Sequence, residues 1–222
     1  MSSVVGLTGG RRPGRLAPVL LGAALLCILA APAAVQAKVD RHHARQYDAR
    51  LSEQRSLCSG VEEMLGSYRD LLQQGIVTMR ELLGAEEIDW EAVRVEQDNY
   101  DQLWEEWNDH LKMINAARAS ATLFEADALG DRSNRKDPLP WFTSKSAAAD
   151  KKVFRRGMAA LQNAYEVLEE AGFHYRRGFD ALSRQFPVVA EAEESFAKGN
   201  EDTVTGAKFA DRGFAKLEQL RR

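Results

Sequence analysis

Two turns of the sequence place a glutamate and a histidine four residues apart, the spacing that lets both side chains reach one metal ion from the same face of a helix. The first pair is Glu106 and His110, and the second is Glu170 and His174. Di-metal carboxylate bundles use a Glu-x-x-His spacing instead and draw acids from four helices. Counting along the two expected helices also separates His110 from His174 by about 13 Å in height, at ~1.5 Å per residue. A shared metal site is therefore the less favoured interpretation.

Motifs for other kinds of chemistry are missing from the sequence. It has no Cys-x-x-Cys-His run for covalent haem, no Gly-x-Ser-x-Gly, no His-Glu-x-x-His and no phosphate-binding glycine loop. Its adjacent glutamate pairs fall on polar arcs of the expected helices, where nothing separates their pKa values for acid-base work. We therefore expect a protein that is not an enzyme and needs no cofactor.

Three arginines recur in one heptad phase of the C-terminal half. Arg156, Arg177 and Arg212 are separated by 21 and 35 residues, and each is followed by a glycine. A glycine costs a helix roughly 1 kcal/mol relative to alanine, so a neighbouring backbone or a bulky aromatic ring is expected to fill each notch. The repeat indicates either a duplicated coiled-coil segment, which we favour, or a row of arginines for an anion or an acidic partner.

The connection 130–146 carries two large apolar residues, Trp141 and Phe142, in an otherwise polar stretch. Pro138 and Pro140 exclude a continuous helix through it. Long connections in a compact domain are often functional, and aromatic residues dominate binding hot spots. Trp141 and Phe142 are thus candidate partner-binding residues. The alternative, which we weigh more heavily, is that both rings seal one end of the helical core.

The apolar pattern predicts an all-α fold. Apolar residues alternate at steps of four and three from Phe154 to Val189, which is typical of a helix packed lengthwise against others. Similar stripes run from Tyr47 to Leu82 and from Trp90, with Asp89 as its cap, to about Leu129. We predict an antiparallel bundle of three long helices. Pro187, Gly199 and Asn200 then indicate a short C-terminal helical hairpin in place of a fourth long helix.

The residues at the N-terminus predict export. Arg11, Arg12 and Arg15 precede an apolar run, 16–35, that closes on a small-x-small site ending at Ala37. This is the pattern of a secretory signal peptide cleaved after Ala37, leaving 38–222 as a single helical-bundle domain. The alternative is an uncleaved anchor, since twenty apolar or small residues at ~1.5 Å each just span ~30 Å of hydrocarbon.

Composition narrows the partners of the exported domain. Loss of residues 1–37 removes three arginines and no acids, so 27 basic and 33 acidic side chains remain, a net charge of about −6. An acidic domain is not a nucleic-acid binder, whose affinity rests on a basic surface. Cys58 is the one cysteine left, so the domain has no internal disulfide, and we expect the thiol to be a small buried side chain.

These observations favour an exported scaffold or protein-interaction module of the cell envelope, in the periplasm or outside the cell. Its partner is another protein or a second copy of the chain. Contact with a membrane follows only if the leader stays uncleaved. The alternative function is a small-ligand or metal sensor that uses the aromatic first half of the second helix, which holds Trp90, Tyr100, Trp104 and Trp107.

The leader generates a direct test. We expect the mature protein to begin at Lys38, because Val35 and Ala37 occupy the small-residue positions of the cleavage site. Intact-mass spectrometry of protein from an exporting host measures this end group. A mass that still includes Met1, measured on protein from a membrane fraction, would contradict cleavage and support the uncleaved anchor.

Overall fold

The computed structural model of the 222-residue chain describes residues 39, 41, 43–130, 141–142 and 147–221. The side chains of four residues inside a helix are outside this description, namely Gln102, Trp104, Glu105 and Glu106. The predicted leader, 1–37, also lies outside the described residues. Everything described belongs to one compact unit, Ala37–Arg222.

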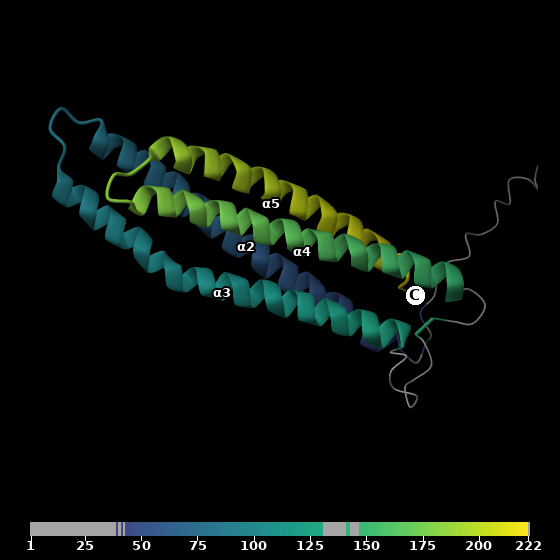
Figure 1. Ribbon diagram of the computed structural model, residues 1–222. Helices are drawn as coiled ribbons and strands as arrows, with labels where there is room; N and C mark the ends of the chain where they lie inside the picture. Colours follow the sequence, from purple (N-terminus) through teal and green to yellow (C-terminus); the bar gives the residue numbers. More distant parts are fainter. Residues whose placement is uncertain (1–38, 40, 42, 131–140, 143–146, 222) are drawn as a thin grey trace, which may run out of the picture. The chain divides into compact units, whose positions relative to one another are not determined.

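The fold is all-α, and four long helices account for most of the described residues. They are α2 (Ala44–Leu83), α3 (Trp90–Leu129), α4 (Ala147–Ser183) and α5 (Val189–Glu218). Successive helices reverse direction, and the links α2–α3 and α4–α5 lie at the same end of the bundle (Figure 1). Each helix packs on the next, α5 packs back on α2, and α2 also contacts α4 across the core.

The heptad stripes are the faces that the helices bury. The predicted seam on α4 is buried from Phe154 through Leu182, and the stripe on α2 is buried from Tyr47 through Met79. The cap at the start of α3 is also as predicted, since the Asp89 carboxylate accepts hydrogen bonds from the backbone N–H groups of Glu91 and Ala92, at 3.0 and 3.1 Å. That contact satisfies two of the N–H groups that a helix start leaves unpaired.

Helices α4 and α5 approach each other most closely because small residues repeat every seven positions on both. The buried series are Gly157, Ala164, Ala171 and Gly178 on α4, and Ala192, Gly199, Gly206 and Gly213 on α5. A Cβ atom on Gly213 would lie 3.0 Å from the carbonyl oxygen of Gly157, so the two backbones are in contact there. The notches beside Gly157 and Gly213 are thus filled by a facing backbone, as expected, together with leucines, and Leu72 of α2 fills the one beside Gly178, where no aromatic ring is found among its nearest atoms.

The predicted C-terminal hairpin is wrong, because Val189–Glu218 is one continuous helix. Local signals suggested a break at Gly199 and Asn200, but tertiary contacts keep both in the helix. The ring of Tyr175 fills the space beside Gly199, where a Cβ would lie 2.5 Å from it. The hydroxyl of Tyr175 also donates a hydrogen bond to Oδ1 of Asn200, at 2.9 Å. The bundle therefore has four long helices.

The start of α2 and the end of α5 are joined without a covalent link. The backbone N–H of Val39 donates to the carbonyl of Leu220 (3.3 Å), and the buried hydroxyl of Tyr47 donates to the carbonyl of Leu217 (2.7 Å). The Leu217 carbonyl also accepts from the backbone N–H of Leu220 (3.1 Å), so Tyr47 adds a second hydrogen bond to the last turn of α5.

One polar network crosses the apolar core. Tyr165 on α4 donates to Oε1 of Gln54 on α2 (2.9 Å), Nε2 of Gln54 donates to Ser120 on α3 (2.8 Å), and Ser120 donates to Glu53 (2.8 Å). Gln54 is fully buried, and both ends of its amide are paired. A register shift of any of the three helices would leave these groups unpaired, at a cost of about 1–3 kcal/mol each.

Within the described part of the chain, no helix combines the length and the apolar content needed to cross a bilayer.

The α4–α5 contact predicts opposite effects for two glycine substitutions. Gly213→Ala should lower the free energy of unfolding by about 1–3 kcal/mol, because its methyl group forces two backbones apart. Gly66→Ala is the matched control, since Gly66 lies inside α2 with nothing within 4 Å of its Cβ position. It should raise stability by about 0.4–1 kcal/mol. Denaturant unfolding of both variants measures the difference, and two changes of the same sign would contradict the close packing.

Candidate functional site

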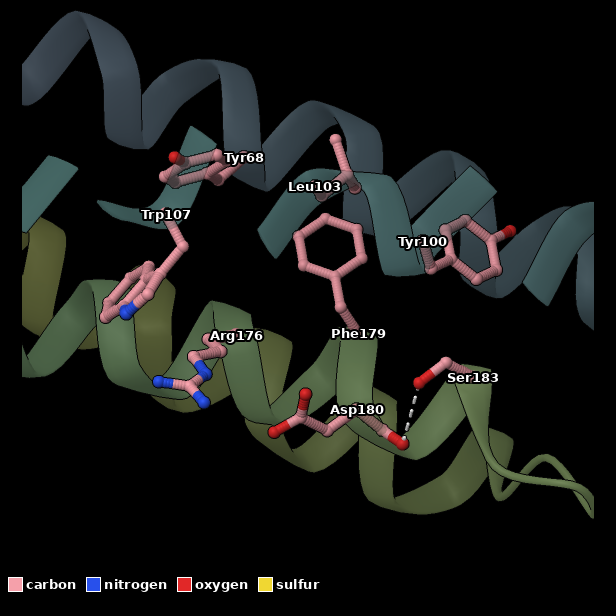
Figure 2. A pocket seen from close by; sticks show the side chains of 8 residues that line it. All are labelled: Tyr68, Tyr100, Leu103, Trp107, Arg176, Phe179, Asp180 and Ser183. Carbon is pink, nitrogen blue, oxygen red and sulfur yellow. Dashed lines mark hydrogen bonds between the residues drawn. The ribbon is translucent and has the colours of Figure 1, made fainter. Parts of the chain in front are cut away.

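A pocket opens between α2, α3 and α4, in the half of the bundle nearer the α2–α3 and α4–α5 links (Figure 2). Its walls are largely aromatic, and its charged groups come from α4. With its open mouth it encloses about 350 Å³ of space between atoms, and its inner part has room for about one water molecule. The lining residues are Tyr68 on α2, Tyr100, Leu103 and Trp107 on α3, and Arg176, Phe179, Asp180 and Ser183 on α4.

Three charged or polar groups define the chemistry of the pocket. The indole N–H of Trp107 is buried and has no acceptor among the described residues, and the ring is only 4% exposed. The guanidinium of Arg176 lies 5.7 Å from the centre of that ring. One helical turn further, the carboxylate of Asp180 lines the mouth and accepts no hydrogen bond from the described residues. Burial raises the pKa of Asp180, while nearby Arg176 and Arg184 lower it.

Next to the pocket, His110 is enclosed completely. It is 0% exposed, and neither ring nitrogen has a hydrogen-bond partner among the described residues. Its imidazole lies 5.1 Å from the ring of Trp107 and 5.8 Å from the ring of Tyr68, measured between centroids. Gly172 provides the room, because a Cβ there would lie 2.5 Å from Nε2 of His110. The glycine at this seam position thus accommodates two ring side chains of α3.

A second surface lies at the end of the bundle where the α2–α3 and α4–α5 links meet, and we name it the bundle tip (residues 84–91 and 184–188). Trp90 and Phe186 form an edge-to-face pair there, with ring centroids 6.4 Å apart. They are 45% and 70% exposed. Gln97 donates a hydrogen bond to the carbonyl of Arg184, which ties α3 to the second link. The aromatic pair is thus held in place but open to solvent.

The bundle tip carries excess negative charge. Glu86, Glu87 and Glu91 are exposed and form no ion pair with any described residue. Arg80 near the end of α2 and Arg184 in the tip itself are already paired with acids of α5, in the ion pairs Arg80–Glu193 and Arg184–Glu191. Among the described residues, Arg94 is a further cation beside the aromatic pair.

The predicted metal candidates do not converge. His110 reaches the height of Gly172, so the expected offset of 13 Å from His174 is wrong, because the residue count assumed that α4 begins level with the end of α3. His174 nevertheless faces α5, with Nε2 3.4 Å from Asp202 and 3.8 Å from Glu170. The side chain of Glu106 lies outside the described residues. Among the described residues, no three His, Cys, Asp or Glu side chains are grouped to hold a metal.

The three arginines of the heptad repeat are exposed but are not brought together as one site. Arg156 and Arg177 are 21 residues apart on α4, which is about 31 Å along a helix. Arg177 pairs with Glu191 (3.3 Å), and Arg212 lies over the ring of Phe209 at 5.9 Å. A single bound anion cannot contact all three guanidinium groups.

Trp141 and Phe142 are buried, each 3% exposed, so neither ring is presented to a partner in this structure. Trp141 packs against Phe124, Tyr47 and His43, with centroid distances of 5.9 to 6.3 Å. Phe142 packs on Phe154 at 5.5 Å. The pair closes the end of the core opposite the bundle tip.

Cys58 is the small buried side chain that the sequence predicts. It is 3% exposed, and burial, with a contribution from nearby Glu62, raises the pKa of the thiol to about 12. Since the thiolate is the reactive form, this cysteine is inert at neutral pH.

No protein-family model, curated protein or solved structure matches the chain. The case for function therefore rests on the two surfaces described above. Of their residues, sequence reasoning noticed Trp90, Tyr100 and Trp107 but missed Arg176 and Asp180. The four-residue spacing of Arg176 and Asp180 on one edge of the α4 seam was the available signal.

We expect the stability of the bundle to fall as the pH is lowered from about 6.5 to 4 because of His110. Burial lowers the pKa of the imidazole from 6.5 to about 4, so in this window the unfolded chain binds a proton that the folded chain does not. The loss reaches roughly 3 kcal/mol at the acidic end, at ~1.4 kcal/mol per pKa unit. Denaturant unfolding at both pH values should show a smaller loss for His110→Leu than for the wild type. Equal losses would contradict the burial of a neutral imidazole.

Proposed function

We propose that the protein is a non-enzymatic interaction module that binds another protein through the bundle tip. The observation that carries the proposal is the exposed Trp90–Phe186 pair beside three glutamates that form no ion pair with any described residue. The partner segment is basic and contributes an apolar side chain that inserts against the two rings.

The aromatic pair supports binding because large exposed rings are costly to leave in water. Ile88 and Val188 extend the apolar surface, at 36% and 40% exposure, and come from the same two links. Interface hot spots are enriched in tryptophan and cluster where a pocket is complete. The recess beside Phe186 and Trp90, which Arg94, Gln97 and Gln185 also line, offers a place for one side chain.

Charge selects the kind of partner. Opposite charges steer association and suppress wrong partners, so the carboxylates of Glu86, Glu87 and Glu91 favour a segment rich in lysine or arginine. The same charges oppose a second copy docking tip to tip, because like charges would face each other. An anionic membrane surface is disfavoured for the same reason.

The proposed setting is outside the cytoplasm. The leader pattern at residues 11–37 supports export of the domain. The bundle itself supports a scaffold role, because its long helices are closely packed. They hold the bundle tip at a fixed distance from the opposite end, where hydrogen bonds join the start of α2 to the end of α5.

A synthetic amphipathic helix of lysine and leucine tests the tip. Combined replacement Trp90→Ala and Phe186→Ala should weaken its binding at least about tenfold, since each aromatic hot spot is worth ~2 kcal/mol. Thermal stability should change little, because both rings are open to solvent, Phe186 at 70% and Trp90 at 45% exposure. Fluorescence anisotropy of a labelled peptide measures the affinity.

The matched control is Leu123→Ala with Val204→Ala, two apolar residues that are 54% and 53% exposed away from the tip. This variant should bind like the wild type. An equal loss in both double variants, or peptide binding that does not weaken with added salt, would contradict the proposal. A concentration-dependent dimer that Phe186→Ala dissolves would identify a second copy as the occupant and would also contradict it.

A further inference from the structure

The contact between Gly157 of α4 and Gly213 of α5 decides where the residues next to it point. The two helices run antiparallel and meet at these glycines (Figure 1), so the residues before the glycines point to one side of the pair and the residues after them to the other. The residues after them are buried in the core, namely Met158 and Phe214. The residues before them, Arg156 and Arg212, are exposed and therefore lie together on the outer side of α4 and α5.

Five more basic residues surround these two arginines. Residues four positions apart are neighbours on a helix surface. Those that stand four positions from an arginine of this group, or next to one, are Lys151, Lys152 and Arg155 on α4 and Lys208 and Lys216 on α5. We name all seven residues the basic face. It lies near the start of α4 and the end of α5, and thus at the end of the bundle opposite the tip.

The basic face contains no acid of its own. The one acid in the segments 151–163 and 205–217 is Asp211. Its charge acts on Cys58 and Glu62, so it lies on the side of α5 that faces α2. Asp150 stands just before the α4 segment, but it is only 2% exposed and belongs to the core. The positive charge of the face is therefore not balanced by carboxylates of these segments.

Lysines without an ion-pair partner among the described residues are concentrated on the basic face. Six lysines lie in the described part of the chain, and the two elsewhere, Lys112 and Lys198, form ion pairs with Asp109 and Glu194. The four lysines of the basic face form no ion pair with any described residue, and neither do its three arginines. Excess cations gathered on one face of an acidic domain indicate an anionic partner there.

The basic face fits an array of phosphate groups better than the surface of a protein. Protein interfaces bury large apolar side chains at their centre. None of the exposed large apolar residues of the described chain falls within 151–163 or 205–217. The ring of Phe209 is half-buried, and the guanidinium of Arg212 lies over it at 5.9 Å from its centre. Arginine and lysine side chains readily bind phosphate oxygens, arginine often with two parallel hydrogen bonds.

We propose that the basic face binds the phosphate headgroups of an anionic membrane surface. Arg156 and Arg212 donate hydrogen bonds to phosphate oxygens, and the other five side chains contact neighbouring headgroups. The choice of a bilayer over a nucleic acid rests on the proposed setting outside the cytoplasm, which the leader pattern supports. Binding of this kind needs no uncleaved leader, in contrast to the expectation from the sequence. The acidic bundle tip, at the opposite end, stays away from the lipid charge and remains open to its own partner.

Vesicle flotation tests the proposal. Soluble protein from an exporting host is used, because this is the form expected to lack residues 1–37. We expect it to float with vesicles of equal parts phosphatidylglycerol and phosphatidylcholine at about 0.05 M salt, and to stay behind with pure phosphatidylcholine vesicles. Raising the salt to about 0.5 M should release it, because the Debye length shrinks. No flotation with the anionic vesicles, or equal flotation with both kinds, would overturn the proposal.

Two triple variants with the same change in net charge locate the binding face. The test variant carries Lys152→Gln, Arg156→Gln and Arg212→Gln. Each basic residue near an anionic surface strengthens binding about fivefold, so this variant should bind the anionic vesicles about a hundredfold more weakly. Its thermal melting should match that of the wild type, because all three side chains are exposed.

The control variant carries Arg69→Gln, Arg80→Gln and Lys112→Gln, which replace exposed cations of α2 and α3. It should float like the wild type. An equal loss in both variants would show that only the total charge matters, and would overturn the assignment to this face.

Soluble anions separate the bilayer from other sources of negative charge. Release of the protein from vesicles by glycerol 1-phosphate at about 1 mM would identify a site for a single phosphate. Tighter binding to a DNA oligonucleotide or to polyglutamate than to vesicles, at equal anion concentration, would assign the face to a nucleic acid or to an acidic protein. Any of these results would overturn docking on a bilayer. The variant Trp90→Ala with Phe186→Ala should float like the wild type, so a failure of the tip proposal is distinguishable from a failure of this one.

Discussion

The contact between the backbones of α4 and α5 is the constraint on which the rest of the bundle depends. At Gly157 and Gly213 the two helices are so close that a Cβ on Gly213 would lie 3.0 Å from the carbonyl oxygen of Gly157. Larger side chains of each helix fill the space beside the glycines of the other, as Leu217 does beside Gly157 and Leu168 does beside Gly206. The outer glycines of α4 receive side chains of the other two helices, with Leu72 of α2 against Gly178 and the rings of Trp107 and His110 of α3 against Gly172. The pocket lies on the α3 side, where contact is made by rings and not by backbone.

Much of this fold follows from the sequence. The stripes on α2, α3 and α4, the Asp89 cap and the burial of Cys58 are all decided by local spacing and polarity, and the structure agrees with each. The continuous helix α5 could not be predicted, because Gly199 and Asn200 are helix-breaking signals when they are considered without their tertiary contacts. Their partner, Tyr175, comes from a different helix, and its ring and hydroxyl override the local preference. Phe186 continues the α4 stripe in sequence, yet it lies beyond the last turn and is exposed.

The functional surfaces were less predictable than the fold. The aromatic content of the first half of α3 was visible, but whether a ring faces the core or solvent depends on which neighbour covers it. Trp107 is covered by α2 and α4, whereas Trp90 extends past them. The height of His110 relative to α4 depends on how far along each other α3 and α4 pack, which residue spacing does not encode. The sequence did not mark Asp180 as a pocket residue, because it lines the pocket together with the indole of Trp107, which comes from another helix.

The hydrogen bonds that join Val39 and Tyr47 to the last residues of α5 give the bundle a fourth junction, alongside its three covalent connections. The helices therefore form a closed ring, in which each junction only has to hold two neighbouring helix ends together. The order of the helices along the chain is thus one of several circular permutations compatible with the same core.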